Sequence, residues 1–241
     1  MDLQDYECEG LSVVADGSVL TARFDRDGGN PISMAICAAL TRLLRDPPTG
    51  AHVLVLTAAG PTFCLGRDRG ASDAGGLIGE AEALIALNQS LDRTRLVTVA
   101  RVQGDAAGFG AGLAALCDVA IAVRSARFSF PEARIPLAPA IVLAWLSRVV
   151  GRRTAFWLTA TGEPVEGDDL VRLSLVNEVV EGEGALDAAV TRRVEALVGG
   201  SPRVQAEVRR MLRDFDGLTT DQAYAMAASR LVVGSLRRSE P

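Results

Sequence analysis

The sequence predicts an α/β protein built on a mainly parallel β-sheet. Hydrophobic residues make up 49% of the chain but aromatic residues only 5%. Small and medium aliphatic side chains must therefore fill the core, which suits helices packed on a sheet. Strand-like runs also alternate with helical stretches of about ten to fifteen residues, a pattern typical of right-handed crossovers between parallel strands. We expect one compact α/β core followed by a helical C-terminal region.

The N-terminal segment predicts a hairpin and a first helix. Residues 11–25 alternate apolar and polar around an Asp-Gly pair, the signature of a two-residue turn between antiparallel strands. Asn30 and Pro31 have the composition of a helix cap followed by a first-turn proline, and helical spacing of apolar residues continues to about Arg45. Further strands are expected at 53–57, 97–104, 118–123 and 175–180, and further helices at 77–93, 108–117, 138–149, 151–160, 166–173 and beyond 185.

The charge composition excludes several classes of function. The net charge of −5 and the pI near 5.1 argue against broad binding of nucleic acid, which requires a basic face. All 25 basic residues are arginines, so the chain has no lysine for a Schiff base or for a P-loop. We expect no nucleic-acid partner.

Cysteine and histidine give no sign of a metal site or of a catalytic triad. The four cysteines are scattered without a CxxC motif, and we expect them to be reduced. The single histidine, His52, opens an apolar run and has the character of a strand-entry residue; no GxSxG motif is present. The most apolar segment, from Ile135, is too short to span a bilayer and contains two prolines. We expect a cytoplasmic protein without a metal or a membrane span.

Two glycine-bearing junctions carry the functional signal. The segment 63–68 reads FCLGRD, and 103–113 reads QGDAAGFGAGL and leads into a helix. Unpaired N–H groups at a helix start carry partial positive charge and can bind an oxyanion. Each motif alone is also typical of a tight turn with close packing between strand and helix.

Taken together, four segments resemble the crotonase (enoyl-CoA hydratase/isomerase) superfamily. They are HVLVLTAAGPTFCLGRD, QGDAAGFGAGLAALCDVAIA, FSFPE and SLVNEVV, in the family's order and spacing. The resemblance runs from about residue 10 to about residue 235. It implies a spiral of ββα units over 1–184, a helical trimerisation or lid region over 185–241, and a homotrimer or homohexamer. It also implies an acyl-CoA thioester as substrate, with coenzyme A as part of that substrate and no separate cofactor.

The resemblance assigns roles in the active site. The backbone N–H groups of Arg67 and Phe109 would form the oxyanion hole for the thioester oxygen. In the hydratases of this family two glutamates share a water. The second is matched by Glu132, whereas Gly112 stands at the position of the first. A single glutamate resembles the arrangement in Δ3,Δ2-enoyl-CoA isomerases, so we expect Glu132 to shuttle a proton between C2 and C4.

Other residues receive weaker assignments, and each has a structural alternative. Asp105 is a possible second acid/base, or a loop carboxylate; Asp68 and Asp118 are expected to accept hydrogen bonds that order loops. Glu80 and Glu82 either line the acyl pocket or face solvent. The expected coenzyme A contacts are Arg26, Leu65, Gly66, Asp68 and Arg69, and the expected acyl-pocket residues are Leu77, Leu84, Gly112, Ile141 and Trp145, most of which core packing would also explain.

Two further functions stay open at this point. The chain could catalyse another reaction on an enolate-stabilising scaffold, such as the hydration of an enoyl-CoA or a different lyase or hydrolase reaction. It could also be a coenzyme A-binding or assembly subunit that lost efficient chemistry when glycine came to occupy position 112.

Overall fold

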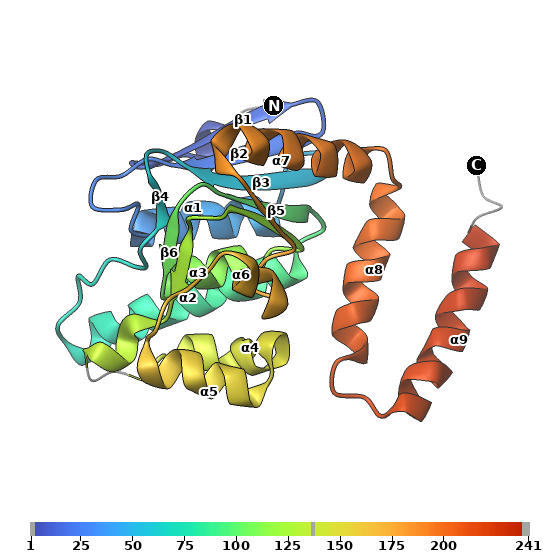
Figure 1. Ribbon diagram of the computed structural model, residues 1–241. Coiled ribbons are helices and arrows are strands. Elements are labelled where there is room, and N and C mark those ends of the chain that lie inside the picture. Colours follow the sequence, from blue (N-terminus) through green and yellow to red (C-terminus); the bar gives the residue numbers. More distant parts are fainter. Residues whose placement is uncertain (1–2, 136–137, 238–241) are drawn as a thin grey trace. The chain divides into compact units, whose positions relative to one another are not determined.

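The computed structural model of the protein describes residues 3–135 and 138–237 (Figure 1). The chain forms two compact units, the first ending at Pro202 and the second beginning at Arg203. Among the described residues, no helix is both long enough and apolar enough to cross a membrane.

A six-stranded sheet forms the centre of the first unit. Its strand order is β1-β2-β3-β5-β7-β10, and all neighbours are parallel except the N-terminal hairpin β1-β2. All six residues of β3 are buried, as expected for a parallel strand covered on both faces. The strands are β1 (Leu11–Asp16), β2 (Val19–Phe24), β3 (Val53–Ala58), β5 (Val97–Val102), β7 (Val119–Val123) and β10 (Glu178–Val180).

A second sheet of short strands has the order β4-β6-β8-β9. Each long strand β3, β5 and β7 is followed by a short strand of this second sheet, so the chain alternates between the two sheets and confirms the predicted ββα repeat. The short strands were missed from the sequence because two or three residues are too few to show alternation. They are β4 (Thr62–Cys64), β6 (Asp105–Ala107), β8 (Arg127–Ser129) and β9 (Val165–Glu166).

Helices cover the central sheet. In Figure 1, α7 lies above β3, which it contacts, while α1 and α2 lie below β3 and pack against each other. The helices are α1 (Met34–Arg45), α2 (Ala74–Arg93), α3 (Phe109–Ala115), α4 (Ala140–Val150), α5 (Arg152–Thr161), α6 (Asp168–Arg172), α7 (Gly182–Val198), α8 (Pro202–Phe215) and α9 (Thr220–Arg237), with short 3-10 helices η1 (Gln4–Tyr6) and η2 (Pro131–Arg134).

The first helix begins later than predicted. The N-cap of α1 is Ser33, whose side chain accepts a hydrogen bond from the N–H of Ile36 at 3.2 Å, so the predicted cap at Asn30 is wrong. Asn30 instead adopts a positive φ of 56°, and its side-chain amide donates to two carbonyl oxygens at the β3–β4 connection at 2.9 and 2.8 Å. This side chain fastens the segment that leads to the first glycine-bearing junction.

The helical region begins in contact with the central sheet. Helix α7 buries Leu186, Ala189 and Val190 and contacts β5 and β7, which is why the first compact unit continues to Pro202 and not only to residue 184. The role of residues 185–241 in trimerisation or as a lid stays a prediction, as does the oligomeric state.

Candidate active site

Two glycines let the predicted junctions approach each other closely. A Cβ at Gly110 would lie 2.2 Å from the carbonyl oxygen of Cys64, and a Cβ at Gly104 would lie 1.8 Å from that of Pro61. No side chain could occupy either position without moving the neighbouring backbone. The start of α3 and the end of β4 are therefore in direct contact, which brings the FCLGRD and GFGAGL motifs together.

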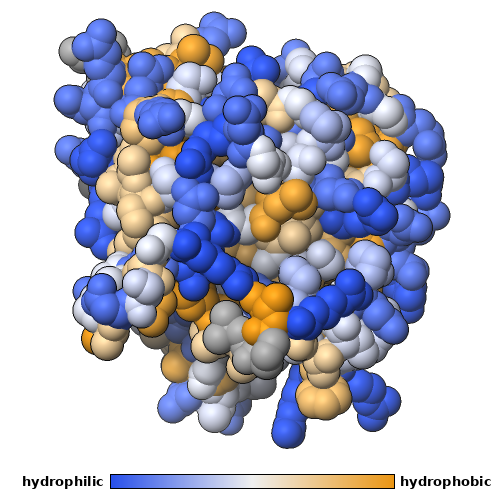
Figure 2. Space-filling model, turned by 90° about the vertical axis from the view of Figure 1, so that its left-hand side faces the viewer, coloured by the Kyte–Doolittle hydropathy of each residue, from blue (hydrophilic) through white to orange (hydrophobic). Residues whose placement is uncertain are grey.

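These motifs form one wall of a cavity of about 520 Å³. Figure 2 looks onto the side of the molecule where the β4–α2 segment runs in Figure 1, and apolar side chains gather in the centre and lower half of this face, bordered by hydrophilic ones. Eight of the predicted site residues line the cavity: Leu65, Gly66, Arg67, Arg69, Leu84, Phe109, Glu132 and Ile141. The lining that the sequence analysis missed includes Ala81 from α2, Gly108, and residues 138–140 and Val142 at the start of α4.

Two backbone N–H groups of this wall have no acceptor in regular secondary structure. Arg67 forms a parallel bridge with Ile32, in which Ile32 N–H donates to Gly66 O and Asp68 N–H donates to Ile32 O, both at 2.9 Å. This pattern directs the N–H of Arg67 away from Ile32. Phe109 is the first residue of α3, so its N–H has no intrahelical acceptor. Both residues line the cavity, where such N–H groups can bind an oxygen of a ligand.

Glu132 brings a carboxylate to the same cavity. It lies in η2 directly after Pro131 and is half-buried. Its Oε1 is 2.7 Å from the point that a Cβ would occupy at Gly108, the residue before α3. Its Oε2 is buried and accepts no hydrogen bond from the described part of the chain. The carboxylate therefore lies next to the residue that precedes α3 and has an acceptor oxygen without a hydrogen bond from the described residues.

The surroundings of Glu132 favour its protonated form. Burial raises the pKa of this carboxyl above its ordinary value, and the hydrogen bond from its own backbone N–H and the charges of Arg69 and Arg67 oppose that shift. A carboxylate with a raised pKa in a cavity is a stronger base than an ordinary glutamate, which makes Glu132 a candidate general base.

Gly112 and Trp145 lie against each other behind the cavity wall. A Cβ at Gly112 would be 3.2 Å from Cζ2 of Trp145, tighter than an ordinary van der Waals contact. Trp145 is 6% exposed and packs edge-on against Phe130, with ring centroids 6.5 Å apart. Neither residue is in the cavity lining among the described residues, and Leu77 is likewise outside it, at 45% exposure. Their predicted contact with the acyl chain stays a prediction.

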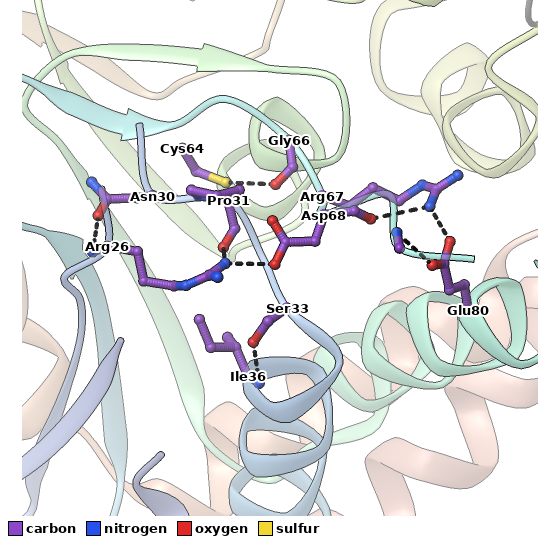
Figure 3. Close-up of polar contacts among 11 residues, drawn as sticks. Arg26, Asn30, Pro31, Ser33, Ile36, Cys64, Gly66, Arg67, Asp68 and Glu80 are labelled. Carbon is purple, nitrogen blue, oxygen red and sulfur yellow. Dashed lines mark hydrogen bonds and ion pairs between the residues drawn. The ribbon is translucent and has the colours of Figure 1, made fainter. Parts of the chain in front are cut away.

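The loop after Arg67 is held by Glu80 of α2 (Figure 3). Nη1 of Arg67 donates to Oε2 of Glu80 at 2.5 Å, and the N–H groups of Gly70 and Ala71 donate to its Oε1 at 3.0 and 2.7 Å. Glu80 is 8% exposed, so the alternative of a solvent-facing residue is wrong for Glu80, whereas Glu82 is exposed. Neither glutamate is among the described residues that line the cavity. The hydrogen bond from Ala71 is the main cause that lowers the pKa of the Glu80 carboxyl, with help from Gly70 and Arg67 and against the effect of burial.

Arg26 and Asp68, both predicted to contact coenzyme A, bind each other. Nη1 of Arg26 donates to Oδ2 of Asp68 at 2.8 Å and to the carbonyl oxygen of Pro31 at 2.5 Å (Figure 3). Asp68 thus has the predicted loop-ordering role, and so does Asp118, which accepts from the N–H and hydroxyl of Thr98. Arg69 lies in the cavity lining and is exposed.

Asp105 joins two strands of the second sheet. Its carboxylate pairs with the guanidinium of Arg127 at 2.8 Å and accepts from the backbone N–H of the same residue at 3.0 Å. Asp105 is not in the cavity lining among the described residues. This connecting position between β6 and β8 agrees with the alternative of a structural carboxylate, and a role of Asp105 as second acid/base stays a prediction.

No three of the described His, Cys, Asp and Glu side chains are grouped to hold a metal ion. His52 is buried directly before β3, in keeping with the predicted strand entry. Among the described residues, the cavity lining contains one carboxylate, that of Glu132, two arginines and a majority of apolar residues.

Comparison with known proteins identifies the family. The model of the enoyl-CoA hydratase/isomerase family matches residues 15–232. The chain belongs to this family. A Thermus thermophilus protein named as an enoyl-CoA hydratase is 30% identical over 217 residues, which are 85% of this chain and 83% of that protein. An enoyl-CoA hydratase of Alternaria alternata is 28% identical over 222 residues, 90% of this chain and 74% of the relative.

Solved structures of the enoyl-CoA hydratase/isomerase family confirm the predicted crotonase fold. An enoyl-CoA hydratase of Mycobacterium smegmatis superposes with a TM-score of 0.89 at 28% identity, covering 96% of this chain and 92% of that one. One from Shewanella pealeana also gives 0.89, at 26% identity, with 100% and 93% coverage. The protein is an acyl-CoA enzyme of this family.

Proposed function

We propose that this acyl-CoA enzyme moves the double bond of a 3-enoyl-CoA to the 2 position, with Glu132 as its only acid/base. The observation that carries the proposal is the combination of one half-buried carboxylate, Glu132, in the cavity with a glycine, Gly112, which is in contact with Trp145 and stands at the position of the first hydratase glutamate. Addition of water requires a group to hold and orient that water, whereas isomerisation requires only a base that takes and returns one proton.

The reaction uses the cavity as follows. The thioester oxygen accepts hydrogen bonds from the N–H groups of Arg67 and Phe109, and Glu132 removes a proton from C2. The electron pair of that C–H bond forms a C1–C2 double bond and the carbonyl pair moves onto the thioester oxygen, while the C3–C4 double bond stays in place. The intermediate is a dienolate whose negative charge lies largely on the thioester oxygen, where the two donors stabilise it. When Glu132 gives the proton to C4, the carbonyl re-forms, the C1–C2 pair becomes the C2–C3 double bond of the product, and the C3–C4 pair binds the proton, so the atoms of substrate and product balance.

A raised pKa of the Glu132 carboxyl suits its use first as a base and then as an acid. A carboxylate whose proton is neither too weakly nor too strongly held can act as base in the first step and as acid in the second. The free Oε2 of Glu132 provides the acceptor for the first step. Exposed Arg69, in the cavity lining, is the cation that we expect to bind a phosphate of coenzyme A.

The second candidate is the hydration of an enoyl-CoA, favoured by the names of the relatives, several of which are called enoyl-CoA hydratases. In that reaction Glu132 would have to activate water without a partner carboxylate at position 112. We rank it below isomerisation for that reason.

The test compares two substrates with two proteins. Wild type and the Glu132→Gln variant are each incubated with a 3-enoyl-CoA and with crotonyl-CoA, and the products are separated by chromatography. We expect wild type to give 2-enoyl-CoA from the first substrate and little 3-hydroxyacyl-CoA from the second, and Glu132→Gln to lose about 10²- to 10⁴-fold in rate with nearly unchanged acyl-CoA binding. Efficient hydration of crotonyl-CoA would overturn the proposal, and binding without any turnover would favour a coenzyme A-binding subunit.

A further inference from the structure

We infer that Trp145 determines which reaction the site can catalyse, because its indole occupies the space that a second carboxylate would need. This inference rests on the proposed function and deepens it. It explains why the site contains one acid/base. It also identifies a residue on α4, far from the glycine motif in sequence, that prevents a second carboxylate from entering the site.

A side chain at position 112 would point along the cavity side of α3. Gly112 lies three residues after Phe109 on α3, and residues at this spacing share a helix face. Phe109 lines the cavity, so a side chain at position 112 would extend along the same side of the helix, one turn further from the helix start. Gly112 is itself buried, which means that such a side chain would enter an occupied region.

The indole of Trp145 already fills the space next to Gly112. The group that the first side-chain atom at position 112 would meet is the indole of Trp145, with Cζ2 at 3.2 Å and Cε2 at 3.9 Å. A glutamate has four further heavy atoms beyond Cβ and would overlap with the ring. Trp145 cannot move aside without cost, because it is 6% exposed and packs against Phe130.

The indole of Trp145 offers a hydrogen-bond donor but no base. Nε1 of Trp145 is buried and has no acceptor among the described residues. An indole N–H can donate a hydrogen bond, but it can neither accept one nor take up a proton. The indole therefore fills the place of the second carboxylate without replacing its chemistry, since a water beside it would find no second base.

A stability measurement tests the contact without any assay of activity. We expect Gly112→Ala to lower the midpoint of thermal unfolding, because the added methyl group would lie only 3.2 Å from the indole of buried Trp145 and this tight contact outweighs the gain in helix propensity. In a Trp145→Phe background, which keeps an aromatic ring against Phe130 but removes the outer ring of the indole, the same change should cost clearly less. Equal losses in the two backgrounds would show that Trp145 does not restrict position 112, and would overturn the inference.

An activity measurement tests the consequence. Gly112→Glu, Trp145→Ala and the double variant Gly112→Glu/Trp145→Ala are assayed for hydration of crotonyl-CoA. We expect the double variant to exceed each single variant by at least about 10-fold, and addition of Glu132→Gln to abolish the gain. Hydration by Gly112→Glu alone at the rate of the double variant would overturn the inference. If the double variant does not fold, the stability comparison decides.

The two proposals fail in different ways. If wild type isomerises no 3-enoyl-CoA, the proposed function fails, whereas the stability coupling and the gain of hydration still report on Trp145. If wild type isomerises but neither coupling nor gain is found, only the role of Trp145 is wrong.

Discussion

Oε2 of Glu80 accepts a hydrogen bond from Nη1 of Arg67 at 2.5 Å, so a buried carboxylate on α2 holds the side chain of a residue that lines the cavity. The other oxygen of Glu80 binds two further N–H groups of the same loop. The loop between β4 and α2 thus has one anchor on a regular helix, which fixes the direction of the Arg67 backbone.

We predict that Glu80 positions the Arg67 amide. Glu80→Ala should reduce kcat by about 10- to 100-fold with little change in KM, because a displaced donor weakens binding of the dienolate more than binding of the substrate. Glu80→Gln, which can still accept hydrogen bonds from the loop, should retain more activity than Glu80→Ala. Steady-state kinetics with a 3-enoyl-CoA measure both effects.

The matched control for this prediction is Glu82→Gln, which removes an exposed carboxylate from the same helix. We expect it to have wild-type kinetics. Equal loss in the Gln variants at 80 and 82 would mean that the charge of α2, and not the anchor, matters.

The N–H of Phe109 can be removed without removing a helix residue. Proline is well tolerated at the first position of a helix, and Phe109 occupies that position in α3. We predict that Phe109→Pro lowers kcat by about 10²- to 10³-fold, as expected for the loss of one oxyanion donor. Phe109→Leu, which keeps the N–H and an apolar side chain, should lose far less. Circular dichroism checks that both variants fold, and similar rates for the two would contradict a donor role.

Glu132 should make activity and stability respond to pH in opposite directions. The base must be ionised, so kcat should fall at acid pH, with a midpoint above that of an ordinary glutamate because burial raises its pKa. Since the folded state binds this proton more tightly than the unfolded state, the stabilisation is present below the ordinary pKa and is lost as pH rises through the raised one.

The variant Glu132→Gln separates these two effects. It should be inactive, yet its midpoint of thermal unfolding should exceed that of wild type at pH 7, and by less at pH 4, where the wild-type carboxyl is largely protonated. Calorimetry at the two pH values provides the measurement. A lower midpoint than wild type at pH 7 would show that the ionised carboxylate is stabilising. That result would contradict the expectation from its Oε2, which is buried and has no hydrogen-bond partner among the described residues.

Gly110 is predicted to be sensitive to the smallest substitution. Gly110→Ala places a methyl group against the Cys64 carbonyl and should reduce the free energy of unfolding by about 1–3 kcal/mol. It should also reduce turnover, because it separates β4 from α3. The control is Gly79→Ala on α2, an exposed helical position with nothing within 4 Å, where we expect about 0.5–1 kcal/mol of stabilisation. Denaturant titration measures both, and equal stability of Gly110→Ala and wild type would refute the close contact.

Much of the fold follows from local patterns in the sequence. The hairpin turn after Asp16, the strand 53–57 and the helices around 138–160 lie close to where periodicity predicts them. The short strands of the second sheet and the cap of α1 were not predictable in the same way. Two or three residues carry no period, and the side chain of Asn30 bonds to carbonyls that are distant in sequence.

The site residues fall into the same two groups, those predictable from local patterns and those that depend on contacts distant in sequence. The cavity positions of Arg67, Phe109 and Glu132 agree with motif matches, because those motifs describe local backbone shape. The partners of Asp105 and Glu80, and the contact of Trp145 with Gly112, depend on which elements meet in three dimensions. Single-sequence patterns do not contain that information.

The donors proposed for the reaction are peptide groups, so the identity of the side chains at positions 67 and 109 is left open by the chemistry, while the glycines at 104 and 110 are not. Random mutagenesis would accordingly find, besides Glu132, further positions that tolerate no substitution at glycines that never touch the substrate. The sequence requirements of such an active site therefore include glycines at the positions where two backbone segments meet.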